Sequence, residues 1–392
     1  MKRRIDSFAG LCLLPAETDR HLWCRLARLP GPWSPSLIDS SLVDMPLDIF
    51  GLSSNAFGKA ASSLLAGGAG IFGRVYAAAF ATGRLEPELQ GASPSSARSW
   101  RQRFRAGLLE RRRLVEEEGE FGVTRKAVLS TADGREIECV SIPMPGHDGD
   151  SPHHTLCLSS QAGCRMGCAF CETGRKGLVR NLTAAEIVAE VVTARAILGW
   201  DCRNLVFMGM GEPLDNFPEL AQALSVLMDR RGFAYAAGRI TVCTSGPAGG
   251  LTRLAALGLG RLNVSISLNA GDDAVRSRLM PVNRGHGLSA LADELRSIPR
   301  RKNFVLGVNY CLIPALNDSP YDAQCAAAYC KGLGRTLLNL IPYNPGTQPL
   351  GRAPTPDEVV RFTGWLEQSG VQVRCRAAKG ASIMAGCGQL GS

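Results

Sequence analysis

The sequence has no long hydrophobic run. No uninterrupted apolar stretch approaches the roughly 18 residues that a membrane-spanning helix needs, so we expect no transmembrane segment and no membrane partner. A short apolar stretch at residues 8–14 follows a few basic residues, but Asp6 precedes it and no clear cleavage site follows. These features disfavour a secretory signal, and a cytoplasmic location is expected.

Sequence repeats and low-complexity tracts are also absent from the 392 residues. The composition is that of a soluble globular protein, and the length suits one large domain accompanied by a smaller one. We expect a monomer.

Acidic residues are fewer than basic ones. The formal net charge is +9 and the sequence pI is about 9.0, which favours a polyanionic partner. Seven arginines and two aromatic residues gather in one segment: Arg98, Trp100, Arg101, Arg103, Phe104, Arg105, Arg111, Arg112 and Arg113. Arginine and aromatic side chains suit phosphate contacts and base stacking. The alternative is a solvated helix face that ends at the acidic run 116–118.

A second paired-cysteine motif is missing. Of fourteen cysteines, only Cys168 and Cys171 have C-x2-C spacing, whereas structural zinc sites usually combine two such pairs or one pair with histidines. In a chain of this length without an export signal, reduced thiols are expected rather than disulfides. A zinc site is therefore the weaker alternative.

A third cysteine stands beside that pair. Cys164, Cys168 and Cys171 form a C-x3-C-x2-C loop, and three thiolates so spaced can hold three irons of a [4Fe-4S] cluster. The fourth iron then stays open to a small molecule. This loop is the signature of the radical-SAM superfamily, so we expect the open iron to bind S-adenosylmethionine (SAM). An oxygen-labile cluster also requires a reducing cytoplasm.

Strands and helices alternate through the second half of the chain. The pattern predicts strands at 155–159, 204–208, 239–243, 262–268, 304–310 and 336–341, and helices at 183–198, 218–229, 248–257, 288–297, 321–333 and 356–368. Repeated strand-helix units imply a parallel sheet with right-handed crossovers. Six units are too few for a closed eight-fold barrel. We therefore predict an α/β fold with a partial (β/α)6 radical-SAM barrel, whose functional groups lie at the carboxyl ends of the strands.

The remaining segments are assigned around this barrel. Asp133-Gly134 between two alternating runs predicts a β-hairpin. We expect a poorly structured extension at 1–44 and a helical accessory, RNA-binding domain at 45–120. The β-hairpin and a linker follow at 121–150, and the barrel occupies 151–345. A C-terminal helix, a strand and the cysteine-bearing tail make up 346–392.

Small and polar residues follow the predicted strands. Gly211 and Glu212 follow the second strand, where glycine allows close backbone approach and a carboxylate can bind an ammonium group such as that of methionine. The segment lacks the GK[ST] ending of a P-loop. Thr244-Ser245 and Ser267-Leu268-Asn269 follow the next two strands and suit a ribose and a carboxylate. The alternative is that they merely end strands.

A cysteine near the chain end, Cys387, lies between two glycines. Glycine permits close approach and mobility, and a thiolate is a strong nucleophile, so Cys387 is a candidate catalytic residue.

Several motifs together resemble the RlmN/Cfr family of radical-SAM methyltransferases. They are the segment 156–164, the cysteine loop, 180–183, Met208-Gly-Met-Gly-Glu-Pro213, 279–283, Asn317-Asp318, 339–345 and Gly386-Cys-Gly-Gln-Leu390. The resemblance covers residues 45–390. The family acts on an adenosine of large-subunit (23S) ribosomal RNA, and its RlmN branch also modifies tRNA.

The resemblance implies a two-cysteine mechanism. Cys387 takes a methyl group from one SAM, and a second SAM supplies a radical that activates that methyl for addition to an adenine carbon. Glu138 matches the position proposed as proton acceptor, and Cys157 attacks Cys387 to release the product, leaving a disulfide. The positions that match SAM contacts are Gly211, Glu212, Cys243, Ser267, Leu268, Asn269 and Asn344. The resemblance also implies that two SAM molecules are used per turnover and that a reductase or flavodoxin-type protein donates the electrons.

The chain is closer to the RlmN branch, which methylates adenine C2, than to the Cfr branch, which methylates C8. It departs from the family at Cys243, where serine is usual, and at Asn269, where histidine is usual. Ala381 and Ser382 replace two acidic residues before Cys387. The alternatives are a diverged paralogue with the same chemistry on another RNA or a small molecule, C8 methylation, and a non-catalytic RNA-binding protein with a structural cluster.

Overall fold

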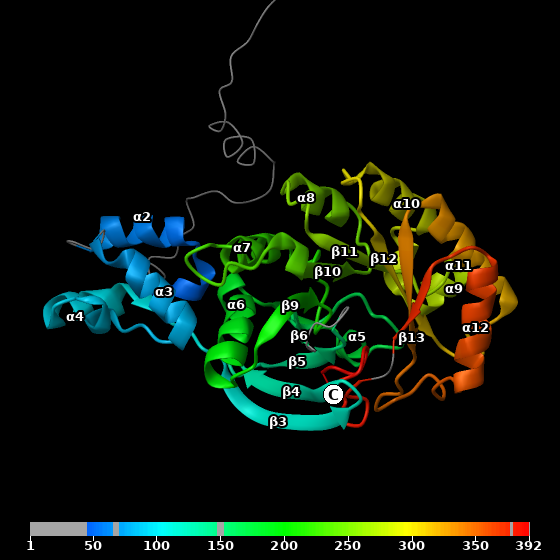
Figure 1. The fold of residues 1–392 in the computed structure, drawn as a ribbon, viewed down its shortest axis with the longest axis horizontal. Helices are drawn as coiled ribbons and strands as arrows, with labels where there is room; N and C mark the ends of the chain where they lie inside the picture. The colour runs from blue at the N-terminus through cyan, green and yellow to red at the C-terminus, as the bar shows by residue number, and fades with distance from the viewer. Residues whose placement is uncertain (1–44, 66–69, 147–152, 377–378, 392) are drawn as a thin grey trace, which may run out of the picture. The chain divides into compact units, whose positions relative to one another are not determined.

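The computed structural model describes residues 45–65, 70–146, 153–376 and 379–391. The predicted extension at 1–44 and most of the predicted linker before residue 153 lie outside the described residues. Figure 1 shows three kinds of element in chain order: short N-terminal helices, an antiparallel set of strands, and strands that alternate with helices. No helix within the described ranges combines the length and the apolar character that crossing a membrane requires.

The N-terminal helices are held together by aromatic packing. The elements are β1 (Leu47–Asp48), α2 (Ser54–Leu64), α3 (Phe72–Thr82), α4 (Pro94–Arg103) and β2 (Phe104–Arg105). Phe57 lies 5.7 Å from Trp100 and 4.8 Å from Phe104 between ring centroids. Trp100 and Phe104 are 0% and 1% exposed, so they belong to the core and are not free to stack on bases, contrary to the sequence-based expectation.

The helical segment is shorter than predicted. The predicted helical domain runs to residue 120, but Glu110–Gly119 forms strand β3, which pairs antiparallel with β4 (Gly122–Ser130). Glu116 on this strand forms an ion pair with Arg125 at 3.0 Å. Cross-strand pairing over the length of β3 outweighs the helix propensity of its Arg, Leu and Glu residues.

One ten-stranded sheet forms the centre of the fold, in the order β14-β13-β12-β11-β10-β9-β6-β5-β4-β3. Strands β3 to β6 are antiparallel, and β6, β9 and the later strands are all parallel. The bounds are β5 Glu136–Met144, β6 His153–Cys157, β9 Cys202–Phe207, β10 Ile240–Thr244, β11 Asn263–Ser267, β12 Leu306–Leu312, β13 Thr336–Pro342 and β14 Val373–Cys375. The six predicted parallel strands are present, and β14 adds a seventh.

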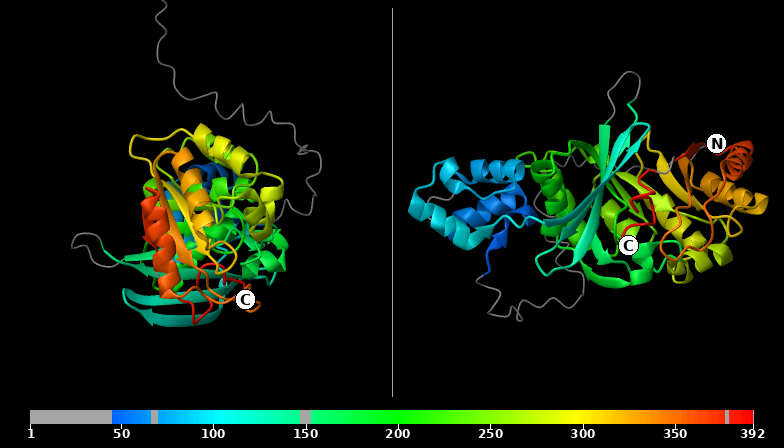
Figure 2. Two further views of the ribbon diagram at one scale, coloured as in Figure 1. Left: turned by 90° about the vertical axis from the view of Figure 1, so that its right-hand side faces the viewer. Right: turned by 90° about the horizontal axis from the view of Figure 1, so that it is seen from below.

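Helices follow the parallel strands, as Figure 2 shows from two further directions. They are α5 Glu172–Lys176, α6 Ala184–Val192 with a π-helical continuation Thr193–Ile197, α7 Phe217–Leu227, α8 Gly250–Ala256, α9 Asp273–Leu279, α10 Leu288–Ser297, α11 Pro320–Gly332 and α12 Pro356–Gln368. Thr183 and Glu186 form a capping box at the start of α6, where the predicted helix 183–198 begins. The chain has the predicted α/β fold with a partial barrel, and the carboxyl ends of the parallel strands share one edge.

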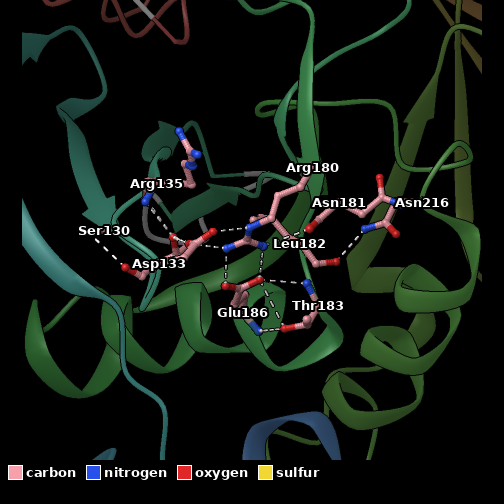
Figure 3. Close-up of polar contacts among 10 residues, drawn as sticks. Ser130, Asp133, Arg135, Arg180, Asn181, Leu182, Thr183, Glu186 and Asn216 are labelled. Carbon is pink, nitrogen blue, oxygen red and sulfur yellow. Dashed lines mark hydrogen bonds and ion pairs between the residues drawn. The ribbon is translucent and has the colours of Figure 1, made fainter. Parts of the chain in front are cut away.

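Arg180 joins the cysteine loop region to the hairpin. A two-stranded sheet of β7 (Gln161–Gly163) and β8 (Leu178–Asn181) flanks the cysteine loop. Arg180 on β8 donates to both oxygens of Asp133 in the hairpin turn, at 2.6 and 2.8 Å, and to Glu186 on α6 at 2.8 Å (Figure 3). Asn216 donates to the carbonyl groups of Ser160 and Leu182 nearby.

We expect Arg180→Leu to lower the free energy of unfolding by about 1–3 kcal/mol, because two charge-assisted pairs are lost at once. Arg180 holds the pKa of Asp133 well below its usual value, so this stabilisation is complete above about pH 4 and is lost as the pH falls further. Chemical denaturation at several pH values measures it. The control is Arg352→Leu, whose pair with Glu358 is screened by solvent and should contribute much less to stability. Equal losses in the two variants contradict a special role for Arg180.

Candidate active site

The cysteine loop begins directly after β7 and lies at the carboxyl end of β6. Gly163 opens it with φ of +79°, and a Cβ there would stand 2.0 Å from the carbonyl oxygen of Gly177. Only glycine fits this turn. The amide of Cys164 then donates to that same carbonyl at 2.9 Å. The loop is therefore fixed against β8, and Cys168 packs against a small apolar cluster at the strand ends: Leu279, Met280, Cys311, Ile313 and Tyr343.

The three loop thiols lie within electrostatic reach of one another. The pKa of Cys164 is raised to about 12, mainly by burial and in smaller part by Glu212 and Cys171. Burial also raises the pKa values of Cys168 and Cys171. Cys164 is buried, and Cys168 and Cys171 are half-buried. Thiols with raised pKa values become thiolates only when a strongly cationic group binds them. Their chemistry thus fits an iron–sulfur cluster.

Within the described ranges, no three Cys, His, Asp or Glu side chains stand at the spacing of ligands to a single ion. A cubic cluster differs from a single ion in this respect, since each thiolate binds a different iron. Cys164, Cys168 and Cys171 are the residues that would hold such a cluster.

Glu212 lies next to the cysteine loop at the end of β9. Its carboxylate accepts hydrogen bonds from the hydroxyl of Thr244 at 2.7 Å, from the amide and hydroxyl of Ser245 at 2.7 and 2.8 Å, and from the amide of Leu214 at 3.0 Å. Burial raises the pKa of Glu212, and these donors oppose the rise. The carboxylate thus ties the end of β9 to that of β10. Gly211, at φ +97°, packs against Ser160 and Gln161, where a Cβ would not fit.

A row of polar side chains crosses the barrel interior between β10 and β14. Asn309 donates to the sulfur of Cys243 at 3.2 Å, Asn339 donates to Asn309 at 3.1 Å, and Arg376 donates to Asn339 at 3.2 Å. Burial raises the pKa of Cys243 to about 11. The row ends at the half-buried side chain of Arg376.

Arg276 holds the ends of β10 and β11 together. The side chain is fully buried and donates to the carbonyl groups of Ser245, Ser267 and Leu268, and to the amide oxygen of Asn283. Ser267, half-buried, and Leu268, buried, are thus fixed by their backbone at the edge of the site. Sequence reasoning missed Arg276 because its helix α9 was not predicted; the capping residue Asp272 was the available signal.

Asn269 adopts a left-handed backbone conformation with φ of +56°. Its side-chain oxygen accepts from the amide of Cys311 at 2.8 Å, and its nitrogen approaches the sulfur of Met280 at 3.1 Å. Both polar atoms are therefore already bonded within the protein. Asn is one of the few residues that tolerate this conformation, which accounts for its presence here.

We expect Asn269→Ala to lower the free energy of unfolding by about 1–3 kcal/mol through the strained backbone and the unpaired amide of Cys311. Asn269→Gly removes the same bonds without the backbone strain and should lose roughly 1 kcal/mol less. Thermal or urea unfolding of the two variants tests this difference, and a larger loss in the glycine variant would contradict the backbone argument.

The C-terminal tail lies across this edge of the sheet. The carbonyl of Gly388 accepts from the amide of Glu172 at 2.8 Å, and that of Leu390 accepts from the hydroxyl of Thr173 at 2.6 Å. Asn344, at the end of β13, donates to the carbonyl of Cys387 at 3.5 Å. Two of these contacts are made by α5, which directly follows Cys171. The tail and the cysteine loop are therefore bound to one another.

Cys387 is exposed, yet protein surrounds its thiol closely enough to raise its pKa by desolvation. Arg376 lowers that pKa and Cys171 raises it. The pKa of Cys157, which is 5% exposed, is raised first by burial and next by Cys387. Cys387 thus influences the ionisation of Cys157, and Cys171 of the cysteine loop influences that of Cys387.

Glu138 on β5 also reaches the tail. One carboxylate oxygen accepts from the amide of Gly391 at 3.0 Å and pairs with the ammonium of Lys126 at 3.5 Å. Lys126 is 1% exposed and Glu138 is 4% exposed. Glu138 was found only through the family resemblance, and Lys126 and Arg376 were missed, since nothing in the pattern of one sequence shows that these cations lie near Cys387.

Known proteins are similar to this chain over most of its length. The model of the radical SAM superfamily matches residues 158–323. The probable dual-specificity RNA methyltransferase RlmN 1 of Protochlamydia amoebophila is 40% identical over 271 residues, which are 69% of this chain and 74% of that protein. The dual-specificity RNA methyltransferase RlmN of Syntrophotalea carbinolica is 41% identical over 68% of this chain and 69% of its own length.

A solved structure is also similar. The radical SAM methyltransferase from Sphaerobacter thermophilus superimposes with a TM-score of 0.77 and 31% identity, covering 88% of this chain and 99% of that one. The fold and the cysteine loop therefore define a radical-SAM enzyme. More specifically, the chain belongs to the RlmN/Cfr family of radical-SAM RNA methyltransferases.

Proposed function

We propose that this protein methylates C2 of an adenosine in 23S ribosomal RNA, with tRNA as a second substrate, through a methyl group carried on Cys387. The names of its relatives support an RNA substrate and the RlmN type of reaction. The observation that carries the proposal is the position of the tail: Gly388, next to Cys387, is hydrogen-bonded to Glu172, next to the cluster ligand Cys171.

When bound, the cluster and SAM supply the methyl group and, after one-electron reduction, the radical that removes a hydrogen atom from it. The thiolate of Cys387 accepts the methyl by displacement, and Arg376 favours that thiolate by lowering its pKa. Glu138 accepts the proton that leaves the adenine ring. Cys157 then attacks the sulfur of Cys387, which breaks the bond to the RNA product and forms a Cys157–Cys387 disulfide for external reduction.

The cofactor contacts extend along the strand ends. Gly211, Glu212, Cys243, Ser267, Leu268, Asn269 and Asn344 line the edge where SAM would bind, with two SAM molecules consumed per turnover. Since Glu212 and Asn269 are already hydrogen-bonded within the protein, we propose that they shape the pocket as much as they contact SAM. A flavodoxin-type protein would supply electrons to the monomeric enzyme in the cytoplasm.

The RNA would approach the exposed arginines of residues 98–113. All seven are exposed. Arg101, Arg105 and Arg112 are paired with carboxylates, so charge attraction to phosphate is the main contribution of this segment, and stacking on Trp100 and Phe104 is not.

The test is incubation of the cluster-loaded protein with unmethylated 23S rRNA fragments, tRNA, SAM and a reductant, followed by nucleoside mass spectrometry. We expect 2-methyladenosine. Formation of 8-methyladenosine would instead assign the Cfr type of reaction, and the absence of any methylated adenosine would leave a paralogue acting on a different substrate.

A further inference from the structure

The inner face of the hairpin forms a surface on which the C-terminal tail lies. Val140 of β5 pairs with Lys126 of β4 on one side and with Cys157 of β6 on the other. Residues directly opposite one another in a sheet point to the same face, and so do residues two apart along a strand. Lys126, Glu138 and Cys157 therefore share one face.

Strand β3 continues this face. Val115 pairs with Lys126 and Glu117 pairs with Thr124, so Glu117 also points to the side of Lys126. The carboxylate of Glu117 accepts from the amide of Gly380 at 2.6 Å and from that of Ser382 at 2.9 Å, and the hydroxyl of Ser382 also donates to it. The tail thus begins its passage over the face at β3. Ser382 is one of the positions where an acidic residue would be usual, and an acidic side chain there would be repelled by Glu117.

Lys126 and Glu138 bind the tail on both sides of Cys387. The ammonium of Lys126 donates to the carbonyl of Met384 at 2.9 Å, three residues before the thiol. Glu138 accepts from the amide of Gly391, four residues after it. Because the two side chains also pair with each other, one buried ion pair holds both ends of the loop that presents Cys387.

The backbone of the loop needs this support. Met384 is a non-glycine residue with φ of +55°, a conformation that costs free energy unless surrounding contacts hold it. The hydrogen bond from Lys126 is made to the carbonyl of this same residue. After Cys387, the tail is held by hydrogen bonds to α5 and to the segment that follows β13.

We propose that Lys126 is a positioning residue for Cys387: with Glu138 it clamps the segment 384–391 on the inner face of the hairpin, so that the thiol stays beside Cys157 and the cysteine loop. Lys126 touches neither the thiol nor the substrate in this role. The inference rests on the proposed function for its consequence in catalysis, but the clamp itself can be tested without RNA.

The test is hydrogen exchange of the cluster-loaded, full-length protein, read on the peptide that covers residues 385–391. A charge-assisted hydrogen bond from a buried lysine is lost in Lys126→Met, so we expect exchange in that peptide to rise by roughly tenfold or more. Lys126→Arg keeps a cation that can reach the carbonyl and should restore most of the protection. The control Lys59→Met changes an exposed lysine on α2 and should leave the peptide unaffected.

A second readout separates positioning from general damage. In Lys126→Met, SAM should still be cleaved under reducing conditions while methylated RNA per SAM cleaved falls by roughly tenfold or more. If burial of unpaired Glu138 prevents folding, the double variant Lys126→Met/Glu138→Gln removes both charges and should fold with the same loose tail.

Unchanged exchange at 385–391 in either loosened variant would overturn the clamp and leave the proposed reaction intact. Conversely, wild-type protein that methylates no RNA but shows the predicted exchange pattern would overturn the proposed function and leave the clamp standing. If Lys126→Met cleaved SAM and methylated RNA at wild-type levels, that result would also contradict the positioning role.

Discussion

Cys387→Ala should make no detectable methylated RNA while it keeps its iron and still cleaves SAM slowly. Removing the thiol removes the atom that carries the methyl group, but the cysteine loop is held by β8 and by the apolar cluster at the strand ends, not by this side chain. We expect a loss in turnover of at least about a thousandfold, as for other catalytic nucleophiles.

Iron content, the ultraviolet–visible spectrum and SAM cleavage are measured beside RNA methylation for this variant. The matched control is Cys375→Ala. Cys375 is exposed on β14 and is neither a cysteine of the loop nor a candidate catalytic residue, so this variant should behave as wild type. Methylated RNA from Cys387→Ala at a rate near that of wild type would mean that the methyl group travels without a protein carrier.

Cys157→Ser should stop the reaction once the carbon carried by Cys387 has been added to the RNA. A serine hydroxyl does not displace a sulfur–carbon bond as a thiolate does, so the RNA should remain covalently attached to Cys387. Cys157 is 5% exposed and interacts electrostatically with Cys387, as a resolving thiol must. The expected result is a protein–RNA adduct that survives denaturation and less than one product per enzyme.

Denaturing gel electrophoresis with labelled RNA detects the adduct. The double variant Cys157→Ser/Cys387→Ala is the control, since it lacks the carrier and should form no adduct. Multiple turnovers by Cys157→Ser without any adduct would assign product release to another group.

Local patterns were sufficient to predict much of this fold. Alternating strands and helices predicted the partial barrel, and the Asp133-Gly134 turn predicted the hairpin. These features depend on neighbouring residues only. Strand β3 was missed because its Arg and Glu residues suit a helix in isolation, and only pairing with β4 makes it a strand.

The cysteine loop was equally clear from spacing, whereas other parts of the site depend on long-range contacts. Lys126 and Met384 are 258 positions apart, and Glu138 and Gly391 are 253 apart, so one sequence gives no sign that they meet. The same holds for Trp100, whose place in an aromatic core is decided by Phe57 and not by the arginines beside it.

The mass of the peptide that contains Cys387, taken from protein made in cells with ample SAM, shows whether the tail carries a methyl group. A thiol that carries the methyl group should be found heavier by one CH2 unit, with the modification on Cys387 itself. An unmodified thiol in every preparation, with iron present at the cysteine loop, would contradict a methyl group carried by the tail.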